Sequence, residues 1–308
     1  MIEAVNLSKE FGTFIAVRDI SLHVDEGEVV ALLGPNGAGK TTTVRMLSAI
    51  LKPTRGYARV AGYDTVTEAK MVRHLIGVLT EFPGLYSRMK GMDYLKFFGE
   101  LQAMSAEQIQ QRSELLLRRF ELWDAQDRQI GKYSKGMKQK LTLVRAMLHD
   151  PNVLFLDEPT SAMDPQSAKL VRDSIRALRA DNRTVILCTH NLNEAEQLAD
   201  RIAVVRQGEI VIEGTPDELK RRLLGHPIME LRVNGSINGI VDYLDEKTNT
   251  VEQGENWIRY AIAEPTQFNP ILLDELNRQQ MSVVTLSEVQ RSLEDVYLNI
   301  VEQKEEVG

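Results

Sequence analysis

The chain has 308 residues, a length that suits one large domain or two smaller ones. Hydrophobic residues make up 43% of it and charged residues 26%, a balance that excludes a disordered or fibrous protein. The longest apolar runs, such as Val29–Leu33, fall far short of the roughly 20 residues that span a bilayer, and no secretory signal is visible at the N-terminus. The single cysteine, Cys188, excludes an internal disulfide framework and fits a reducing cytoplasm.

The net charge of −7 is unevenly distributed along the chain. Residues 226–308 carry a balance of −9, whereas residues 1–225 carry +2. An acidic C-terminal third is a poor partner for phosphate backbones and anionic lipid surfaces. Nucleic-acid binding is therefore disfavoured, although a local basic patch would escape this count.

Short β-rich runs alternate with helical stretches through the first two-thirds of the chain. The expected strands are residues 28–33, 152–156, 184–189, 201–205 and 209–213, and the expected helices are residues 41–50, 164–180 and 191–199. Asp164 is placed to cap the second helix, with Pro165 in its first position, and Asn191 to cap the third. Strands that alternate with helices predict parallel βαβ units and a doubly wound α/β sheet.

Residues from about 83 to 150 break this rhythm, and we interpret them as a helical insertion. A second domain is predicted to begin at residue 226, so that the boundaries are 1–225 and 226–308. Its expected elements are strand 229–233, helix 237–246, strands 250–253 and 257–263, helix 270–280 and strand 282–286, the order of a ferredoxin-like α+β domain. A last helix would place Leu293, Val296, Tyr297, Ile300 and Val301 on one face, either as packed core or as a dimer seam.

A glycine-rich stretch, GPNGAGKTT, occupies positions 34–42 between a predicted strand and a predicted helix. It satisfies G-x-x-x-x-G-K-[ST], in which backbone N–H groups and the helix N-terminus face phosphate oxygens. Lys40 is expected to reach the β- and γ-phosphates, and Thr41 to offer a hydroxyl to Mg²⁺. The structural alternative is an ordinary glycine turn. The nucleotide-binding residues expected in this stretch are Gly34, Pro35, Asn36, Gly37, Ala38, Gly39, Lys40, Thr41 and Thr42.

Two adjacent carboxylates, Asp157 and Glu158, follow the apolar run VLFL. Ligands of open α/β sheets bind at the carboxyl ends of the strands, where this run delivers them. Asp157 is placed to hold Mg²⁺, and Glu158 to act as general base on the attacking water. A solvated acidic turn would be a fair alternative without the glycine-rich stretch.

Four motifs follow one another along the chain: GPNGAGKTT, YSKGMKQKL (133–141), LDEPTSAMDP (156–165) and THNLNEAEQLADRI (189–202). In order and spacing they resemble the motifs of ABC-transporter ATP-binding subunits, over roughly residues 2–225. The resemblance implies a P-loop NTPase core with a parallel sheet, an antiparallel β part and a helical subdomain, and ATP and Mg²⁺ as cofactors.

The second motif stands where this family has its LSGGQ signature, which caps the γ-phosphate of ATP held by the other subunit. Ser134 and Gly136 match the signature, whereas Tyr133, Lys135 and Met137 depart from it. Lys135 either adds positive charge near that nucleotide or is simply solvated. The resemblance therefore implies a head-to-tail dimer of two copies that sandwiches two ATP molecules.

Other roles are also implied by the resemblance. His190 resembles the switch histidine that hydrogen-bonds the γ-phosphate, so that the catalytic set is Glu158, His190 and Lys40. Phe11 matches the aromatic residue that stacks on adenine, with Val17 as a second wall; a core role is the alternative for Phe11. Glu81 stands where most members have a glutamine that touches Mg²⁺, so the expected metal ligands are Thr41, Glu81 and Asp157.

The sequence therefore predicts an ATPase that drives a transporter through separate integral membrane permease subunits. We expect it to be cytoplasmic and peripheral on the inner face of the cell membrane. Part of segment 82–98 is expected to receive a permease helix, with core of the helical subdomain as the alternative for its residues. The C-terminal extension resembles that of exporters of drugs, antibiotics, lipids or polysaccharides. An ATPase that regulates a non-transport machine, on ribosomes or DNA, is the alternative, and the C-terminal domain could also regulate the enzyme, sense a small molecule or support dimerisation.

Overall fold

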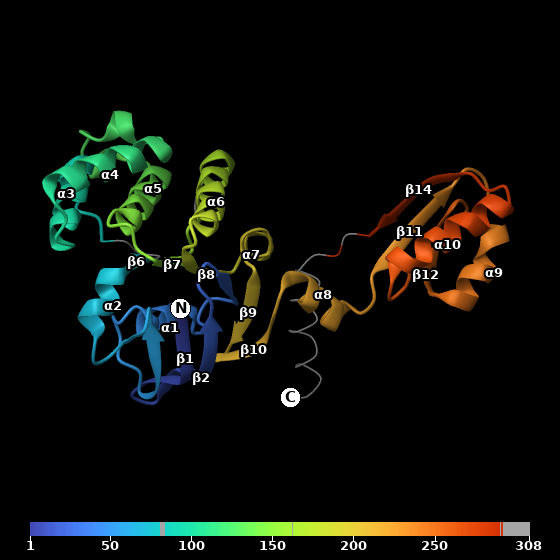
Figure 1. Ribbon diagram of the computed structural model, residues 1–308, viewed down its shortest axis with the longest axis horizontal. Helices are drawn as coiled ribbons and strands as arrows, with labels where there is room; N and C mark the ends of the chain where they lie inside the picture. Colours follow the sequence, from blue (N-terminus) through green and yellow to red (C-terminus); the bar gives the residue numbers. More distant parts are fainter. Residues whose placement is uncertain (81–83, 162, 290, 292–308) are drawn as a thin grey trace. The chain divides into compact units, whose positions relative to one another are not determined.

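The computed structural model describes residues 1–80, 84–161, 163–289 and 291 (Figure 1). It divides into two compact units, residues 1–216 and 217–308. Within the described residues, no helix is long and apolar enough to cross a membrane. The expected apolar helix face at residues 293–301 lies outside the described residues.

The first unit is built on a sheet of ten strands in the order β5-β4-β1-β2-β10-β9-β3-β8-β7-β6. The strands are β1 (Ile2–Phe11), β2 (Phe14–Val24), β3 (Val29–Leu33), β4 (Arg55–Val60), β5 (Tyr63–Asp64), β6 (Ile76–Leu79), β7 (Val153–Asp157), β8 (Thr184–Thr189), β9 (Arg201–Arg206) and β10 (Glu209–Gly214). Its helices are α1 (Lys40–Leu47), α2 (Ala69–Leu75), α3 (Gly91–Leu101), α4 (Ala106–Arg119), α5 (Lys135–Met147), α6 (Pro165–Ala180) and α7 (Leu192–Leu198), with short 3₁₀ turns η1 (Trp123–Ala125) and η2 (Ile130–Lys132). Helix α8 (Pro216–Leu224) begins at the last residue of this unit and lies otherwise in the second.

One half of this sheet is parallel. Strands β9, β3, β8, β7 and β6 are paired in parallel, whereas β1, β2, β4 and β5 form antiparallel pairs and β10 runs antiparallel to β9. The runs VVALL, VLFLD and TVILCT are buried along their whole length, as strands covered on both faces must be. The predicted α/β fold with a mixed sheet and helices is confirmed.

Side-chain caps fix the starts of the helices near the parallel strands. The carboxylate of Asp164 accepts from the Ser167 backbone N–H at 2.9 Å, and the side chain of Asn191 accepts from that of Glu194 at 3.1 Å. Both caps confirm the sequence prediction. The helix predicted at 41–50 is shorter, because the chain turns into the left-handed region at Ala49 (φ 56°).

Helices α3, α4 and α5 occupy the stretch that breaks the βα alternation (Figure 1). Ser105 and Gln108 form a reciprocal capping box at the start of α4. Leu116, Leu117 and Phe120 are buried along its inner face. This segment therefore carries its own apolar packing beside the sheet.

The second unit is a small antiparallel-sheet domain. Its sheet has the order β12-β13-β11-β14, and helices α9 and α10 lie on one face of it (Figure 1). The elements are β11 (Ile228–Val233), α9 (Asn238–Lys247), β12 (Asn249–Gln253), β13 (Trp257–Ala261), α10 (Pro265–Arg278) and β14 (Val283–Glu288). Leu231, Ile258 and Tyr260 of the sheet share a buried core with Leu272 and Leu276 of α10.

The predicted start of the helix at residues 270–280 is wrong. The helix begins at Pro265, and Pro270 lies inside it. A proline in the first turn removes an N–H that would have no intrahelical partner, so either proline could open a helix. The pattern alone therefore favoured the wrong one.

Candidate functional site

The loop from β3 into α1 has a backbone that requires glycine at two points. Gly39 has φ 109°, and a Cβ on it would stand 2.8 Å from the carbonyl oxygen of Ala16. A Cβ on Gly34 would lie 2.2 Å from the carbonyl oxygen of Val205. Larger residues would force these backbones apart, so the glycines keep the loop curled against its neighbours.

Lys40, the first residue of α1, is buried with 6% of its surface exposed. Its Nζ donates to the carbonyl oxygens of Gly34 at 2.6 Å and Pro35 at 3.0 Å. The ammonium group is thereby held inside the loop by the chain's own carbonyls.

Thr41 and Asp157 join the loop to the end of β7. The hydroxyl of Thr41 donates to Oδ2 of Asp157 at 2.8 Å. Asp157 is only 2% exposed, because it ends a strand that lies between β6 and β8. A hydroxyl and a carboxylate from residues far apart in sequence thus meet at one point.

Glu158 has an unusual backbone for a residue with a side chain, φ 52° in the left-handed region. Its N–H donates to the Cys188 carbonyl at 2.9 Å, and its carbonyl accepts from the Gln139 side chain at 3.2 Å and the Ser161 N–H at 3.2 Å. These contacts hold a conformation that a residue other than glycine or asparagine rarely adopts.

The side chain of Glu158 meets His190, which follows β8. Oε1 of Glu158 lies 2.7 Å from Nδ1 of His190 and accepts from its backbone N–H at 3.1 Å. The carboxylate is mostly covered, with 12% of its side chain exposed, whereas the imidazole is largely open. The predicted base and the predicted switch residue are therefore in direct contact.

A cleft of about 350 Å³ lies over the loop and the two carboxylates. It is lined by Phe14, Ala16, Asn36, Gly37, Ala38, Gly39, Lys40, Thr41, Thr42, Asp157 and Glu158. Most of the predicted site residues in the loop and both carboxylates therefore come together here. Gly34 and Pro35 do not line the cleft, but their carbonyls accept from Lys40.

The two residues predicted to contact adenine, Phe11 and Val17, do not line the cleft. Val17 is fully buried in the core, and Phe11 is exposed beside the ammonium of Lys9, 5.2 Å from its ring centre. Phe11 faces Phe14 across the β1–β2 hairpin, and it is Phe14 that lines the cleft. Sequence reasoning missed Phe14, although its place on the other arm of a tight glycine turn was a usable signal.

Ser134 and Gly136 stand at the start of α5 and do not line this cleft. The hydroxyl of Ser134 accepts from the Met137 N–H at 3.1 Å, and space around Gly136 is open. Tyr133, one of the departures from the family signature, is buried and donates its hydroxyl to the Ala125 carbonyl at 2.7 Å. Tyr133 therefore packs the helical segment, while Ser134 stays exposed. Glu81 lies outside the described residues.

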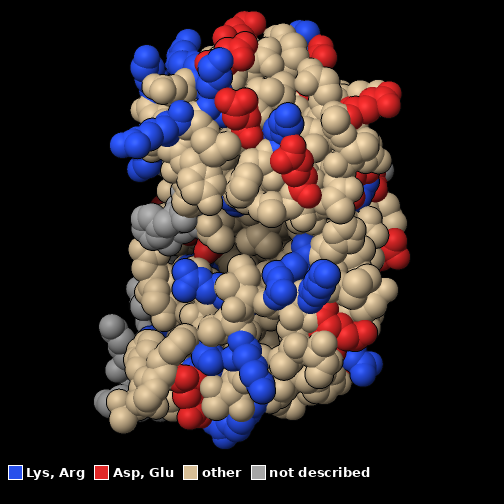
Figure 2. Space-filling view, turned by 90° about the vertical axis from the view of Figure 1, so that its left-hand side faces the viewer, with Lys and Arg blue, Asp and Glu red and all other residues tan. Residues whose placement is uncertain are grey.

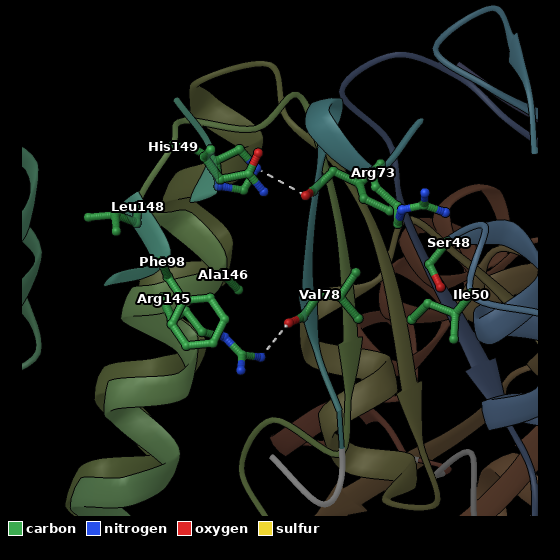
Figure 3. Close-up of a pocket in the computed structure, with 11 residues that line it drawn as sticks. Ser48, Ile50, Arg73, Val78, Phe98, Arg145, Ala146, Leu148 and His149 are labelled. Carbon is green, nitrogen blue, oxygen red and sulfur yellow. Dashed lines mark hydrogen bonds between the residues drawn. The ribbon is translucent and has the colours of Figure 1, made fainter. Parts of the chain in front are cut away.

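A second hollow, of about 220 Å³, lies between α2, α3, β6 and α5 (Figure 3). The guanidinium of Arg145 donates to the Val78 carbonyl at 3.1 Å and lies over the ring of Phe98, and His149 donates to the Ile76 carbonyl at 3.0 Å. Burial lowers the pKa of His149 below its ordinary value. Figure 2 shows the face that carries α2 and α3, hollowed near its middle, with basic side chains below the hollow and both basic and acidic side chains above it.

Three features define a P-loop nucleoside triphosphatase: a curled glycine-rich loop, a buried lysine, and a threonine–aspartate pair at the carboxyl ends of parallel strands. The comparisons with known proteins narrow this class. The family model "ABC transporter" matches residues 17–161, and the model "ATP-binding protein DrrA1-3-like, C-terminal domain" matches residues 214–301.

Among the curated proteins that are similar to the chain over nearly its whole length are the following two. It is 37% identical to "Uncharacterized ABC transporter ATP-binding protein YxlF" of Bacillus subtilis, covering 98% of this chain and 99% of that protein. It is 36% identical to "Daunorubicin resistance ATP-binding protein DrrA3" of Streptomyces coeruleorubidus, covering 95% and 93%. The dimeric, post-hydrolysis structure of the ATP-binding cassette MJ0796 with ADP and Pi superposes with a TM-score of 0.65 at 25% identity, over 70% of this chain and 98% of that one.

The chain belongs to the ATP-binding proteins of ABC transporters. It is an ABC ATPase, which hydrolyses ATP for transport. Cassettes of this family form dimers, and their transporters include membrane subunits.

Proposed function

We propose that this chain powers export through separate permease subunits, by binding and hydrolysing MgATP in the cleft over residues 34–42. The observation that carries the proposal is the Thr41–Asp157 hydrogen bond of 2.8 Å, with Glu158 next in sequence. It brings the phosphate loop and the acidic strand end to one point. Relatives at this similarity are named for daunorubicin resistance and Nod factor export, and we extend export to this chain on that basis.

The oxygens of Thr41 and Asp157 fit Mg²⁺, which prefers hard oxygen ligands and keeps several waters. Glu81 is proposed as a third ligand from the sequence alone. Bound there, the ion would neutralise charge on the β- and γ-phosphates. Lys40, whose Nζ is already oriented by two carbonyls, would add the second positive charge.

Glu158 is proposed as the general base. Its Oε1 would accept a proton from the attacking water, and His190 would donate a hydrogen bond to the γ-phosphate from the position it holds 2.7 Å from that oxygen. The strained backbone of Glu158 aims the carboxylate into the cleft. These two side chains, with Lys40, form the proposed catalytic set.

The adenine ring is proposed to stack at the β1–β2 hairpin. Phe11 remains the proposed partner, and Phe14, which lines the cleft, is the competing surface. Both rings are exposed and stand on facing arms of one turn. Stacking needs only an accessible aromatic face, which either residue offers.

A second copy of the chain is proposed to complete each site with Ser134 and Gly136. Both residues are accessible, and neither lines the cleft of its own chain. The capped N-terminus of α5 would present its N–H groups to the γ-phosphate. The dimeric cassette among the similar structures supports this arrangement.

A permease helix is proposed to dock in the hollow between α2 and α3. The hollow is lined by apolar side chains, including Ile50, Val78 and Phe98, with Arg73 and Arg145 beside them. This mixture suits an amphipathic helix in a groove. The chain would thus be held at the inner face of the cell membrane by its partner.

The C-terminal unit is proposed to be a ferredoxin-like regulatory or dimerisation domain, with its boundary near residue 225. Its β-α-β-β-α-β order and strand order support the fold assignment. A small-molecule sensor is a variant of the same proposal. Thermal shift of the full chain with candidate ligands tests that variant, and no shift with any of them would contradict it.

Replacing Glu158 with Gln tests the proposed base. Turnover should fall by about 100-fold or more, while ATP affinity survives and an ATP-bound dimer accumulates. The dimer is measured by size-exclusion chromatography with multi-angle light scattering. Turnover near that of the unmodified chain would contradict the assignment.

Association with membranes separates export from the non-transport alternative. The tagged chain is extracted from membranes with detergent and its co-purifying proteins are identified. An integral membrane protein supports the proposal, whereas ribosomes or DNA as the main partner would contradict it.

A further inference from the structure

Glu194, in the first turn of α7, is a charged residue in a place where charge is unfavourable. It is 3% exposed, and this burial raises the pKa of its carboxyl. Hydrogen bonds from two threonines lower the pKa and so partly offset the effect of burial. Burying a carboxylate is costly unless its oxygens are satisfied by hydrogen bonds. No role in nucleotide chemistry has so far been given to this residue.

The two oxygens of Glu194 bind separate parts of the site. Oε1 accepts from the hydroxyl of Thr160 at 2.6 Å, and Oε2 accepts from the hydroxyl of Thr189 at 2.7 Å. Thr160 lies two residues after Glu158, and Thr189 immediately precedes His190. One buried carboxylate thus connects the segments that carry the two proposed catalytic side chains.

The contacts continue around Thr189 and close into a ring. Its hydroxyl oxygen accepts from the Asn191 N–H at 3.0 Å, and the side chain of Asn191 accepts from the Glu194 N–H at 3.1 Å. A carboxylate is acceptor-only, so both threonine hydroxyls must donate to it. This leaves the oxygen of Thr189 free to accept from Asn191. An amide has one acceptor oxygen and one NH₂ group, so it can accept from one of the two threonine hydroxyls but not from both.

The two segments that Glu194 connects must be held in position. Glu158 occupies a strained left-handed conformation, and its Oε1 takes both contacts with His190. A strained residue keeps its conformation only where its surroundings fix it. Small errors in the position of a general base have large effects on rate. The carboxylate of Glu194 is well placed to prevent them.

We propose that Glu194 is a positioning residue, whose bridge between Thr160 and Thr189 sets the distance between Glu158 and His190. The inference rests on the proposed function of that pair. Glu194 does not line the nucleotide cleft, so it acts through the two loops and not on ATP itself. It follows that its loss lowers the rate of the chemical step and leaves nucleotide binding in place.

The test is steady-state ATP hydrolysis by the full chain carrying Glu194→Gln. We expect kcat to fall about tenfold, since a hydrogen bond to a charged group is lost or reversed, with KM for ATP unchanged. Glu209→Gln removes the same charge from an exposed position on β10 and should behave as the unmodified chain. Unchanged kcat in Glu194→Gln, or a loss of ATP affinity equal to the loss of rate, would overturn the proposal.

Two milder variants keep the test valid if Glu194→Gln folds poorly. Thr160→Val and Thr189→Val each delete one hydroxyl at nearly constant volume. Each should lower kcat by about fivefold with KM unchanged. Combining either variant with Glu194→Gln should lower kcat by less than the product of the two separate losses, because the same contact is removed twice. Full multiplication of the two losses would show that the threonines and Glu194 act separately, and would overturn the bridge.

Glu158→Gln, measured beside these variants, separates this inference from the proposed function. If Glu158→Gln abolishes turnover while Glu194→Gln does not change it, only the bridge is refuted. If Glu158→Gln keeps its turnover, the proposed base is refuted, and the positioning role of Glu194, which depends on that base, is refuted as well.

Discussion

Two glutamates, one in each unit, bridge a pair of side chains in opposite ways. Glu194 of the nucleotide-binding unit is buried between two neutral hydroxyls, and burial raises the pKa of its carboxyl. Glu230 of the C-terminal sheet binds Arg232 at 2.7 Å and Arg259 at 2.8 Å, and these hydrogen bonds lower the pKa of its carboxyl.

We interpret the difference as one of role: the carboxylate of Glu194 positions neighbouring residues, whereas the carboxylate of Glu230 stabilises its domain. Arg232 and Arg259 also stack on Trp257, and Arg259 pairs with Glu252, so the open face of the C-terminal sheet satisfies its charges internally. At the nucleotide cleft, Lys40 is instead held by backbone carbonyls and Asp157 by the hydroxyl of Thr41. Unfavourable burial of this kind points to a functional site.

Removing a cation from each unit gives the largest predicted contrast. Lys40→Met should abolish detectable ATP hydrolysis, a loss of at least about 100-fold, because no other described side chain in the loop places a cation on the phosphates. Arg259→Met removes a cation from the C-terminal sheet and should leave kcat and KM within about twofold of the unmodified chain. Both are measured by steady-state phosphate release. A large loss of rate in Arg259→Met would end the contrast between the two units.

The adenine wall gives the next largest effect and decides between two aromatic residues. Phe11→Ala should raise KM for ATP by about tenfold with little change in kcat, because base stacking is lost. Phe14→Ala is the matched variant on the other arm of the hairpin. The decisive comparison is KM for ATP between the two variants. A larger rise for Phe14→Ala would transfer the adenine contact to the residue that lines the cleft.

Features that depend on neighbours in sequence could be predicted from the residues themselves. Contacts between strands could be predicted only where the family motifs name both partners, as for Thr41 with Asp157 and Glu158 with His190. The left-handed Gly39 and the caps at Asp164 and Asn191 are local, and the pattern of residue types identifies them. Thr160 and Glu194 are 34 residues apart, and only the adjacency of β7 and β8 brings them together.

The aromatic residue at the cleft shows a second limit of prediction from sequence. Phe11 and Phe14 are both aromatic and close in sequence, and the direction of each ring is set by the register of the β1–β2 hairpin. Val17 matched the expected position of a wall residue, yet it lies on the inner face of β2 and is fully buried. Hydrophobic residue type does not reveal which face of an irregular strand points inward.

The acid stability of the C-terminal unit should depend on Glu230. Because the folded-state pKa of Glu230 is lowered, its bonds add stability that is present above its ordinary pKa and lost as pH falls through the folded value. Glu230→Gln should therefore lower the melting temperature by about 3 °C at pH 7, and by less near pH 4. Differential scanning calorimetry of the full chain follows the two pH values. An equal shift at both would show that the bonds do not depend on the charge.

Glu194→Gln should give a smaller pH effect of the opposite sign. The folded-state pKa of Glu194 is raised, so the ionised form is less favoured in the folded protein than in the unfolded chain. The unmodified chain then loses stability as pH rises from its ordinary pKa through the folded value, and the variant, which has no proton to release, does not. Measured in the same calorimetric series, the melting temperature of Glu194→Gln relative to the unmodified chain should rise between pH 4 and pH 7, whereas that of Glu230→Gln should fall. If the relative melting temperatures of both variants changed in the same direction between pH 4 and pH 7, the two glutamates would be equivalent structural bridges. Burial of a carboxylate between neutral hydroxyls would then not distinguish the nucleotide-binding unit from the C-terminal unit.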